Sequence, residues 1–375
     1  MEEFTVDRNN IPIISKLKKS DIQYYLFFLV IEFGEALNIG SSNQIFLVFA
    51  VIAFLFLVYK VINTKYTTRE LFIIIALSIL GIMIFLYTKK PGGILSIIAM
   101  IGLKEVDIKK VLKLSFYIRL STFFLLIIFT SFGVIRNTII TNTRGDNEVT
   151  RYSMGFSHPN QFHLAFIILL LLCIYIYYQR LNFFHLCFLC LLNISVYFIS
   201  YSRTSTMIGF IALFLVFWFK KKYFCRLKSV FCKSILPFCF LISIVPVLLY
   251  QKLPGIRSID RLLQWRITFS KHYLNGYPLK LFGNNLSLDP IVLDSGYVEL
   301  IINYGLIFTF LYFICFVIIV NRYIKRYMYR ELLLIICLSI YGITESFIPN
   351  LFANLSILFI SDIIFQSSTK REVSS

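Results

Sequence analysis

Residues 44–62 read QIFLVFAVIAFLFLVYKVI. This run contains a single charged side chain, Lys60, and it exceeds the length of about 17 residues that a helix needs to cross the hydrocarbon core of a bilayer. Water is absent from that core, so the backbone polar groups must bond to one another, as they do in a helix. The run therefore predicts a transmembrane helix.

The composition extends this prediction to the whole chain. Of its 375 residues, 58% are hydrophobic and 15% are charged, whereas soluble domains are about 45–50% apolar and about 25% charged. We expect an all-α polytopic membrane protein, a single integral domain over residues 1–375, with about twelve transmembrane helices. The expected spans are 22–38, 44–62, 71–87, 91–103, 112–135, 161–178, 184–200, 204–219, 234–250, 297–319, 332–348 and 351–366.

The distribution of positive charge predicts the orientation. With both termini in the cytoplasm, the inward segments carry 24 Lys and Arg and the outward segments carry 12, of which six lie in one long loop. Cytoplasmic connectors are the ones enriched in Lys and Arg, and long loops weigh little in this rule. Two outer loops, 136–160 and the larger 251–296, exceed ordinary connectors. The net charge of +18 is thus a feature of membrane topology, and no nucleic-acid partner is expected.

Four carboxylates are predicted to lie near the outer surface, namely Glu32, Glu35, Glu299 and Glu345. Ionisable groups inside a membrane are costly, so they are candidates for function. The alternative is that each pairs with an Arg of an outer loop and only holds helices together.

The outer segments also carry several Arg residues: Arg144, Arg151, Arg203, Arg257, Arg261 and Arg266. A guanidinium group binds phosphate through two parallel hydrogen bonds and keeps its charge in any environment. The alternative for any one of them is an ordinary solvated charge. His158 and His272 are candidate general bases, because imidazole titrates near neutral pH. No nucleotide-binding or metal-binding motif occurs, so we expect no cofactor and no metal site.

Five short stretches, in order, resemble motifs of the Wzy-type polysaccharide polymerases. They are RYSMGFSHPN at 151–160, YSRTS at 201–205, RLLQW at 261–265, FGNN at 282–285, and LDSGY at 293–297 with NYG at 303–305. The first half of the chain matches that family only in hydropathy. The stretch 287–293 does not align, and His272 has no firm counterpart.

The resemblance implies a metal-independent glycosyltransferase of GT-C-like architecture in the bacterial cytoplasmic membrane. Such enzymes join oligosaccharide repeat units carried on undecaprenyl pyrophosphate into capsular or O-antigen polysaccharide at the outer face. Besides that substrate and membrane lipids, a chain-length regulator and a flippase of the same pathway are the expected partners. The expected catalytic residues are His158, His272, Glu299 and Glu345. The expected substrate-binding residues are Arg151, Asn160, Arg203, Arg261, Arg266, Asp294 and Tyr297.

Two other functions are compatible with these features. A ligase that moves finished polymer to another acceptor shares the fold and the chemistry. A polysaccharide flippase belongs to a different class, and we expect from it repeated halves and charge deep in the bilayer. The sequence has no evident repeat, and the carboxylates expected within its spans lie towards the outer face.

Overall fold

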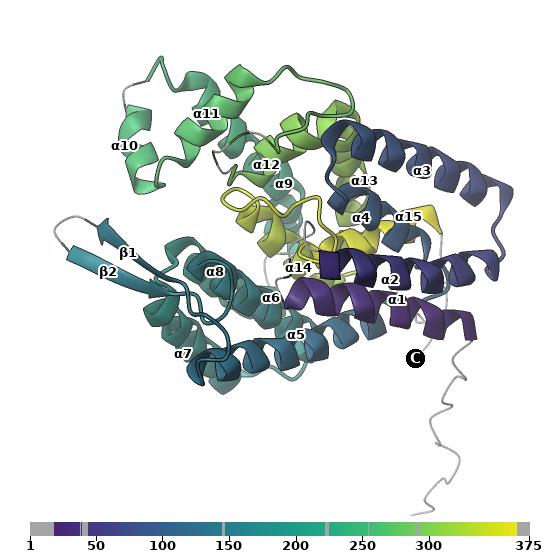
Figure 1. Cartoon of the computed structure of the whole chain (residues 1–375), viewed down its shortest axis with the longest axis horizontal. Coiled ribbons are helices and arrows are strands. Elements are labelled where there is room, and N and C mark those ends of the chain that lie inside the picture. Colours follow the sequence, from purple (N-terminus) through teal and green to yellow (C-terminus); the bar gives the residue numbers. More distant parts are fainter. Residues whose placement is uncertain are drawn as a thin grey trace, which may run out of the picture.

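The computed structural model describes residues 19–37, 39, 44–144, 147–221, 225–253, 255–287, 289, 291 and 293–365. Helices make up most of this part of the chain (Figure 1). The long ones are α1 (Lys19–Ala36), α2 (Gln44–Ile62), α3 (Thr68–Thr88), α5 (Ile108–Ser131), α6 (Pro159–Tyr177), α7 (Phe183–Ser200), α8 (Arg203–Lys220), α9 (Cys225–Leu249) and α13 (Gly305–Lys325). The shorter ones are α4 (Gly92–Ile101), α10 (Gly255–Leu262), α11 (Arg266–Gly276), α12 (Gly296–Glu299), α14 (Tyr329–Tyr341) and α15 (Ser361–Ile364).

Among the described residues, eight helices are long and apolar enough to cross a membrane. They are α2, α3, α5, α6, α7, α8, α9 and the continuous stretch Gly296–Lys325, which includes α12 and α13. The predicted class, an all-α membrane protein, is therefore confirmed, whereas the expected count of about twelve transmembrane helices stays a prediction.

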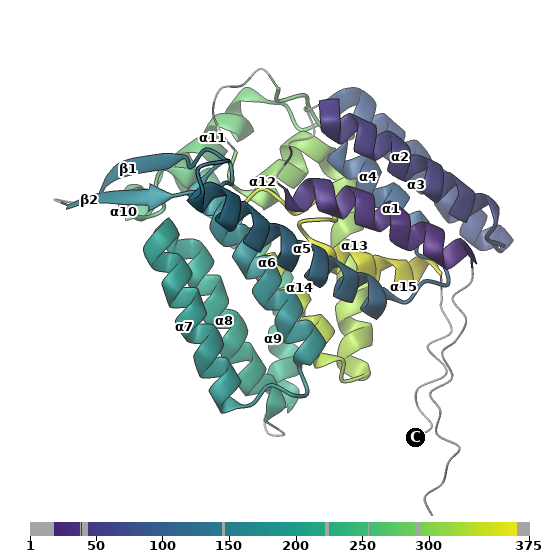
Figure 2. The ribbon, with the colours of Figure 1, turned by 60° about the horizontal axis from the view of Figure 1, so that its bottom comes forward.

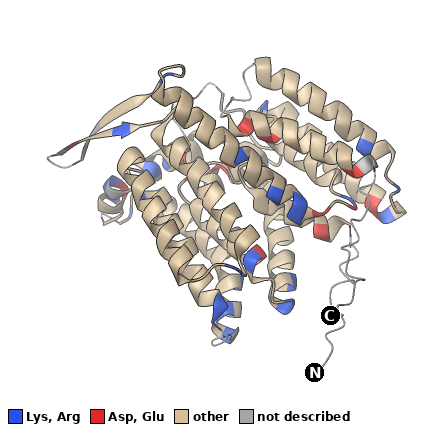
Figure 3. Cartoon of the chain, turned by 90° about the horizontal axis from the view of Figure 1, so that it is seen from below, with Lys and Arg blue, Asp and Glu red and all other residues tan. Residues whose placement is uncertain are grey.

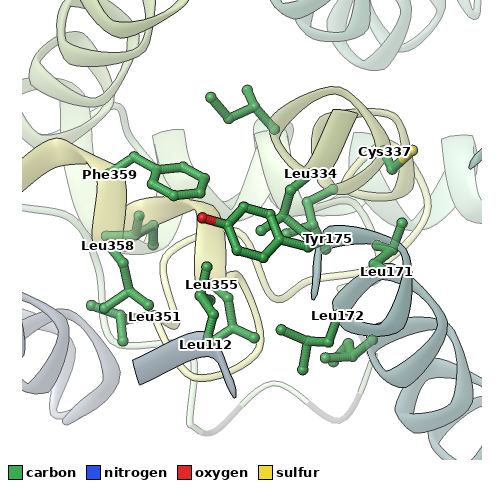
Figure 4. Close-up of a cluster of buried hydrophobic side chains, with 14 of the residues drawn as sticks. Leu112, Leu171, Leu172, Tyr175, Leu334, Cys337, Leu351, Leu355, Leu358 and Phe359 are labelled. Carbon is green, nitrogen blue, oxygen red and sulfur yellow. The ribbon is translucent and has the colours of Figure 1, made fainter. Parts of the chain in front are cut away.

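The distribution of apolar side chains fits lipid as the solvent. Large apolar residues of α2 and α3 remain exposed, for example Leu55 at 65% and Phe72 at 72%. In contrast, α6 lies in the middle of the bundle, where it packs against α5, α7, α8 and α14. Its Tyr175 sits among apolar side chains that include Leu112, Leu334 and Phe359 (Figure 4). Helices α2 and α3, at the periphery of the bundle, thus have a surface suited to lipid, and the core forms around α6.

The helix ends gather at two opposite ends of the bundle. One end carries the antiparallel hairpin of β1 (Ile139–Arg144) and β2 (Asn147–Tyr152), together with α10 and α11, and we call it the hairpin end (Figure 2). At the other end, Lys60 Nζ lies 2.8 Å from Asp21 Oδ1, and Lys104 is paired with Glu70. Along the ribbon, charged residues occur mostly towards helix ends, with long uncharged stretches between them (Figure 3). The segments 136–160 and 251–296, expected as loops on one side of the membrane, thus both contribute elements to the hairpin end.

The last third of the chain differs from the expected spans 332–348 and 351–366. Helix α14 ends at Tyr341, residues 342–354 form a segment without regular helix, and a short 3-10 helix η2 (Leu355–Ile360) precedes α15. Pro349 explains part of this difference, because proline cannot donate a backbone hydrogen bond inside a helix. Irregular backbone is tolerated at membrane depth only where protein buries it or where it lines a cavity.

Side chains of other helices satisfy the backbone of this irregular segment. Ser96 Oγ of α4 donates to Pro349 O at 2.8 Å and accepts from Leu351 N at 2.9 Å. Arg119 of α5 donates to Phe352 O, and Asn354 Nδ2 donates to Ile348 O at 2.9 Å. The segment is therefore held in place by polar groups on α4, on α5 and within itself.

Two glycines of the family-like motifs allow a close backbone approach at the hairpin end. Gly283 and Gly305 both have a φ of +86°. A Cβ on Gly283 would lie 1.9 Å from Asn303 O, and a Cβ on Gly305 would lie 2.4 Å from Gly283 N. Asn303 belongs to the π-helical turn η1 (Leu300–Tyr304) that joins α12 to α13, and Asn284 N donates to Ile302 O at 3.0 Å. Only residues without a side chain fit where these two segments meet.

Candidate functional site

Three arginines surround a small pocket at the hairpin end, which we call the arginine pocket. It is lined by Arg151, Asn160, Ser202, Arg203, Thr204, Leu263, Gln264 and Arg266. These residues come from β2, α6, the start of α8 and the junction of α10 with α11. None of the described residues that line it is acidic. The pocket therefore brings together positive side chains from three separate segments.

Arg151 is buried at the base of the hairpin. Its side chain is 3% exposed, and Nε donates to the backbone carbonyl of Ser200 at 2.8 Å. Its Nη2 donates to the side chain of Asn160 in the first turn of α6. The guanidinium group thus ties the hairpin to the end of α7 and the start of α6, and its planar shape supplies two directed donors.

Arg266 lies at the start of α11 between two carboxylates. Its Nη2 is 3.2 Å from Glu345 Oε1, and its Nε is 3.6 Å from Asp294 Oδ2. It also donates to the backbone carbonyl of Thr344. Burial raises the pKa of Asp294 above its usual value, and the Arg266 charge opposes that rise. This arginine connects α11 to the irregular segment 342–354.

His158 forms the N-cap of α6. Its Nδ1 accepts a hydrogen bond from Asn160 N at 3.1 Å, which satisfies one of the free backbone donors of the first turn. Burial lowers its pKa, and the charges of Arg151 and Arg266 lower it further. Both effects favour neutral imidazole, and because Nδ1 is an acceptor here, the proton of the neutral ring is on Nε2. A structural role for His158 in shaping this turn has direct support.

Two helix N-termini add to the positive potential of the arginine pocket. Arg203 is the first residue of α8, and Asn160 is in the first turn of α6. The N-terminus of a helix carries a partial positive charge and free backbone N–H groups, which together favour anions. The pocket thus has the chemistry of a phosphate or pyrophosphate site.

Several other predicted site residues lie away from the arginine pocket. Glu299 is buried, and its Oε1 is 3.3 Å from Lys90 Nζ. His272 is exposed, and its Nε2 lies 2.8 Å from Asp289 Oδ2. Arg261 is exposed on α10, although its neighbours Leu263 and Gln264 line the pocket. Tyr297 is buried and donates to Ser339 O at 2.9 Å, which is a contact between helices.

A second cavity of about 200 Å³ lies beside the arginine pocket, and we call it the carboxylate cavity. It is lined by Glu35, Ala36, Arg119, Phe156, Gln161, Leu164, Ala165, Ile168, Glu345, Ser346, Phe347, Asn350 and Ala353. Sequence reasoning identified Glu35 and Glu345 as outer carboxylates but gave no role to Gln161 or Asn350. Gln161 directly follows the 151–160 motif, and Asn350 interrupts an apolar run, so the sequence context could have marked both residues as site candidates.

Glu32 lies deeper and does not line either pocket. It is fully buried, and its Oε1 accepts from Arg119 Nε at 2.6 Å and from Ser115. Its partner is therefore an arginine of α5 rather than the expected arginine of an outer loop. This ion pair joins α1 to α5 and favours the structural alternative for Glu32.

Comparison with protein-family models, with curated proteins and with solved structures gives no match to this chain. The resemblance to the Wzy-type polymerases therefore depends on the five short motifs alone. Residues of three of these motifs, Arg151, Asn160 and Arg203 among them, line the arginine pocket.

Proposed function

We propose that this chain polymerises oligosaccharide repeat units linked to undecaprenyl pyrophosphate, at the outer face of a bacterial cytoplasmic membrane. The observation that carries the proposal is the arginine pocket, where three guanidinium groups and the first turns of α6 and α8 converge. A pyrophosphate at a membrane surface is the anion that such a pocket suits. The proposal includes a GT-C-like architecture with about twelve membrane segments, counting the short or irregular ones.

The proposed reaction replaces a glycosyl phosphate bond with a glycosidic bond between two sugars. A hydroxyl oxygen of the acceptor unit attacks the anomeric carbon of the donor chain, and the bond from that carbon to the pyrophosphate oxygen breaks. The bonding electrons leave with undecaprenyl pyrophosphate, and arginine charges stabilise the negative charge that develops on it. Because guanidinium groups stay protonated, they do this without proton transfer.

The proton of the acceptor hydroxyl must move to a base, and we assign that role to Glu345. Its Oε1 is 3.2 Å from Arg266, which lines the arginine pocket, and Glu345 itself lines the carboxylate cavity. Glu345 thus lines the carboxylate cavity and is paired with an arginine that lines the arginine pocket. The Nδ1 of His158 already accepts a hydrogen bond from the backbone of α6, so this nitrogen is occupied.

Deletion of the gene in the source bacterium tests the proposal. We expect polymer to disappear and single repeat units to accumulate on undecaprenyl pyrophosphate, with recovery on expressing the wild-type chain. A ligase would instead leave polymer on its lipid carrier, and a flippase would leave repeat units on the cytoplasmic side. Purified chain in nanodiscs, given lipid-linked repeat units alone, should produce a ladder of longer products. Unchanged polymer in the deletion strain would refute the proposal.

A further inference from the structure

The carboxylate cavity differs chemically from the arginine pocket. Its polar lining includes two carboxylates, Glu35 and Glu345, and two amides, Gln161 and Asn350. Arg119 also lines it, but its Nε is bonded to Glu32. Carboxylates and amide oxygens accept hydrogen bonds from hydroxyl groups, and amide nitrogens donate to them. The cavity therefore suits a neutral ligand with many hydroxyl groups, whereas the arginine pocket suits an anion.

Some of these polar groups are available for a ligand. Among the residues that the structure describes, none forms a hydrogen bond with the side-chain amide of Gln161. Asn350 Nδ2 bonds Glu35 Oε2 at 3.3 Å, which leaves the other carboxylate oxygen of Glu35. The rest of the lining is apolar and includes two aromatic rings, Phe156 and Phe347. A few convergent polar groups within an apolar wall are typical of a small-molecule site.

The position of the cavity connects it to the proposed reaction. Glu345 lines the carboxylate cavity, and its partner Arg266 lines the arginine pocket, so an ion pair links the linings of the two spaces. In a direct displacement the hydroxyl attacks the reacting carbon from the side opposite to the leaving group. The leaving pyrophosphate would occupy the arginine pocket, and the attacking hydroxyl would come from the side of the carboxylate cavity.

We infer that the carboxylate cavity binds the terminal, non-reducing sugar ring of the acceptor unit, and that Glu35 and Gln161 hydrogen-bond its hydroxyl groups. This inference rests on the proposed function. A volume of about 200 Å³ has room for one sugar ring but not for the interior of a polysaccharide chain. The cavity thus selects the end of an acceptor, and it presents one hydroxyl of that end to Glu345.

The test uses the full chain in nanodiscs and two substrates. The donor is lipid-linked repeat unit isolated from the deletion strain. The probe acceptor is the same oligosaccharide, released from its lipid by mild acid and labelled at the reducing end, so that it has the terminal sugar but no pyrophosphate. We expect wild-type chain to extend the probe. For Glu35→Gln and Gln161→Ala we expect the KM for the probe to rise at least tenfold, with the KM for the donor unchanged.

A steric variant provides an independent measurement. Ala165 lines the cavity, so Ala165→Phe should fill it and abolish extension of the probe. The same substitution at Ala76, which is exposed on α3, is the matched control, and Gln23→Ala on α1 is the control for Gln161→Ala. If Ala165→Phe, at normal thermal stability, extends the probe as wild type does, the cavity does not bind the acceptor. The same conclusion holds if Glu35→Gln and Gln161→Ala leave the KM for the probe unchanged. If wild-type chain itself forms no polymer from lipid-linked units, the proposed function fails instead.

Discussion

Replacement of Arg151 with Lys separates the shape of this residue from its charge. The contacts of the guanidinium group include hydrogen bonds in different directions, from Nε to Ser200 O at 2.8 Å and from Nη2 to the side chain of Asn160. A lysine ammonium ends an unbranched chain and should replace only one of them. Losing a hydrogen bond that involves a charged group costs about 1.5–3 kcal/mol. Since the side chain is 3% exposed, water does not substitute for the lost partner.

We therefore expect Arg151→Lys to lower the free energy of unfolding by about 1.5–3 kcal/mol, and to shorten or abolish the polymer because the starts of α6 and α8 shift. Thermal unfolding in nanodiscs and polymer sizing on gels measure the two effects. A double-mutant cycle with Asn160→Ala should give a coupling energy of about 0.5–3 kcal/mol. Arg257→Lys, at an exposed position of α10, is the control. Wild-type stability and polymer length in Arg151→Lys, at normal protein levels, would show that the two hydrogen bonds do not matter.

Three further predictions follow from the geometry. Gly283→Ala should destabilise the chain by at least about 1–3 kcal/mol, because its Cβ would lie 1.9 Å from Asn303 O. Gly276→Ala is the control, since a Cβ at Gly276 meets nothing within 4 Å. Equal thermal unfolding of the two variants would contradict this prediction. His158 has a lowered pKa, so the unfolded chain binds its proton more tightly and stability should fall as the pH drops below about 6.5. His158→Asn keeps a capping acceptor and should lose that part of the pH dependence while still polymerising; loss of polymer in a stable His158→Asn would instead identify this residue as the base. In a cysteine-free chain, a cysteine placed at the exposed position Asn285 should react with an impermeant thiol reagent in intact cells. A cysteine at exposed Tyr327 should react only after lysis. The reverse pattern would overturn the expected orientation, with both termini in the cytoplasm. Asn284 is less suitable for labelling, because it is buried and bonded to Ile302 O.

The helices were predictable because a transmembrane helix depends on local properties, the length and polarity of a run. The run 44–62 gave α2 with the same bounds. The C-terminal runs are also largely apolar, but their structure depends on partners distant in sequence, such as Ser96 and Arg119. No local rule supplies these contacts, so the two expected spans became the short helix α14, the irregular segment 342–354, and η2 with α15.

The site was predictable to the extent that residue chemistry alone indicates function. Arginine in outer segments suggested an anion site, and Arg151, Arg203 and Arg266 do line one pocket. Position in the sequence does not show which side chains face the arginine pocket. Arg261 was therefore predicted to belong to the same site as these three arginines, although it is exposed on α10 and does not line the pocket. The carboxylate cavity was not predicted, because its walls come from α1, α5, α6 and the 342–354 segment, and only the packing of these segments brings Glu35 near Gln161.

The irregular segment 342–354 has a consequence for how the protein is made. Its backbone bonds depend on Ser96 of α4 and Arg119 of α5, which precede it by more than two hundred residues in the chain. Because α4 and α5 are synthesised before the 342–354 segment, this segment packs against helices that are already in the membrane. Until it arrives, Arg119 lacks its contact with Phe352, and the carboxylate cavity lacks the wall that Glu345 and Asn350 provide. Assembly of the proposed acceptor site is thus among the last steps of synthesis. A nascent chain that stops before residue 342 contains the arginines of the arginine pocket but lacks part of the wall of the carboxylate cavity.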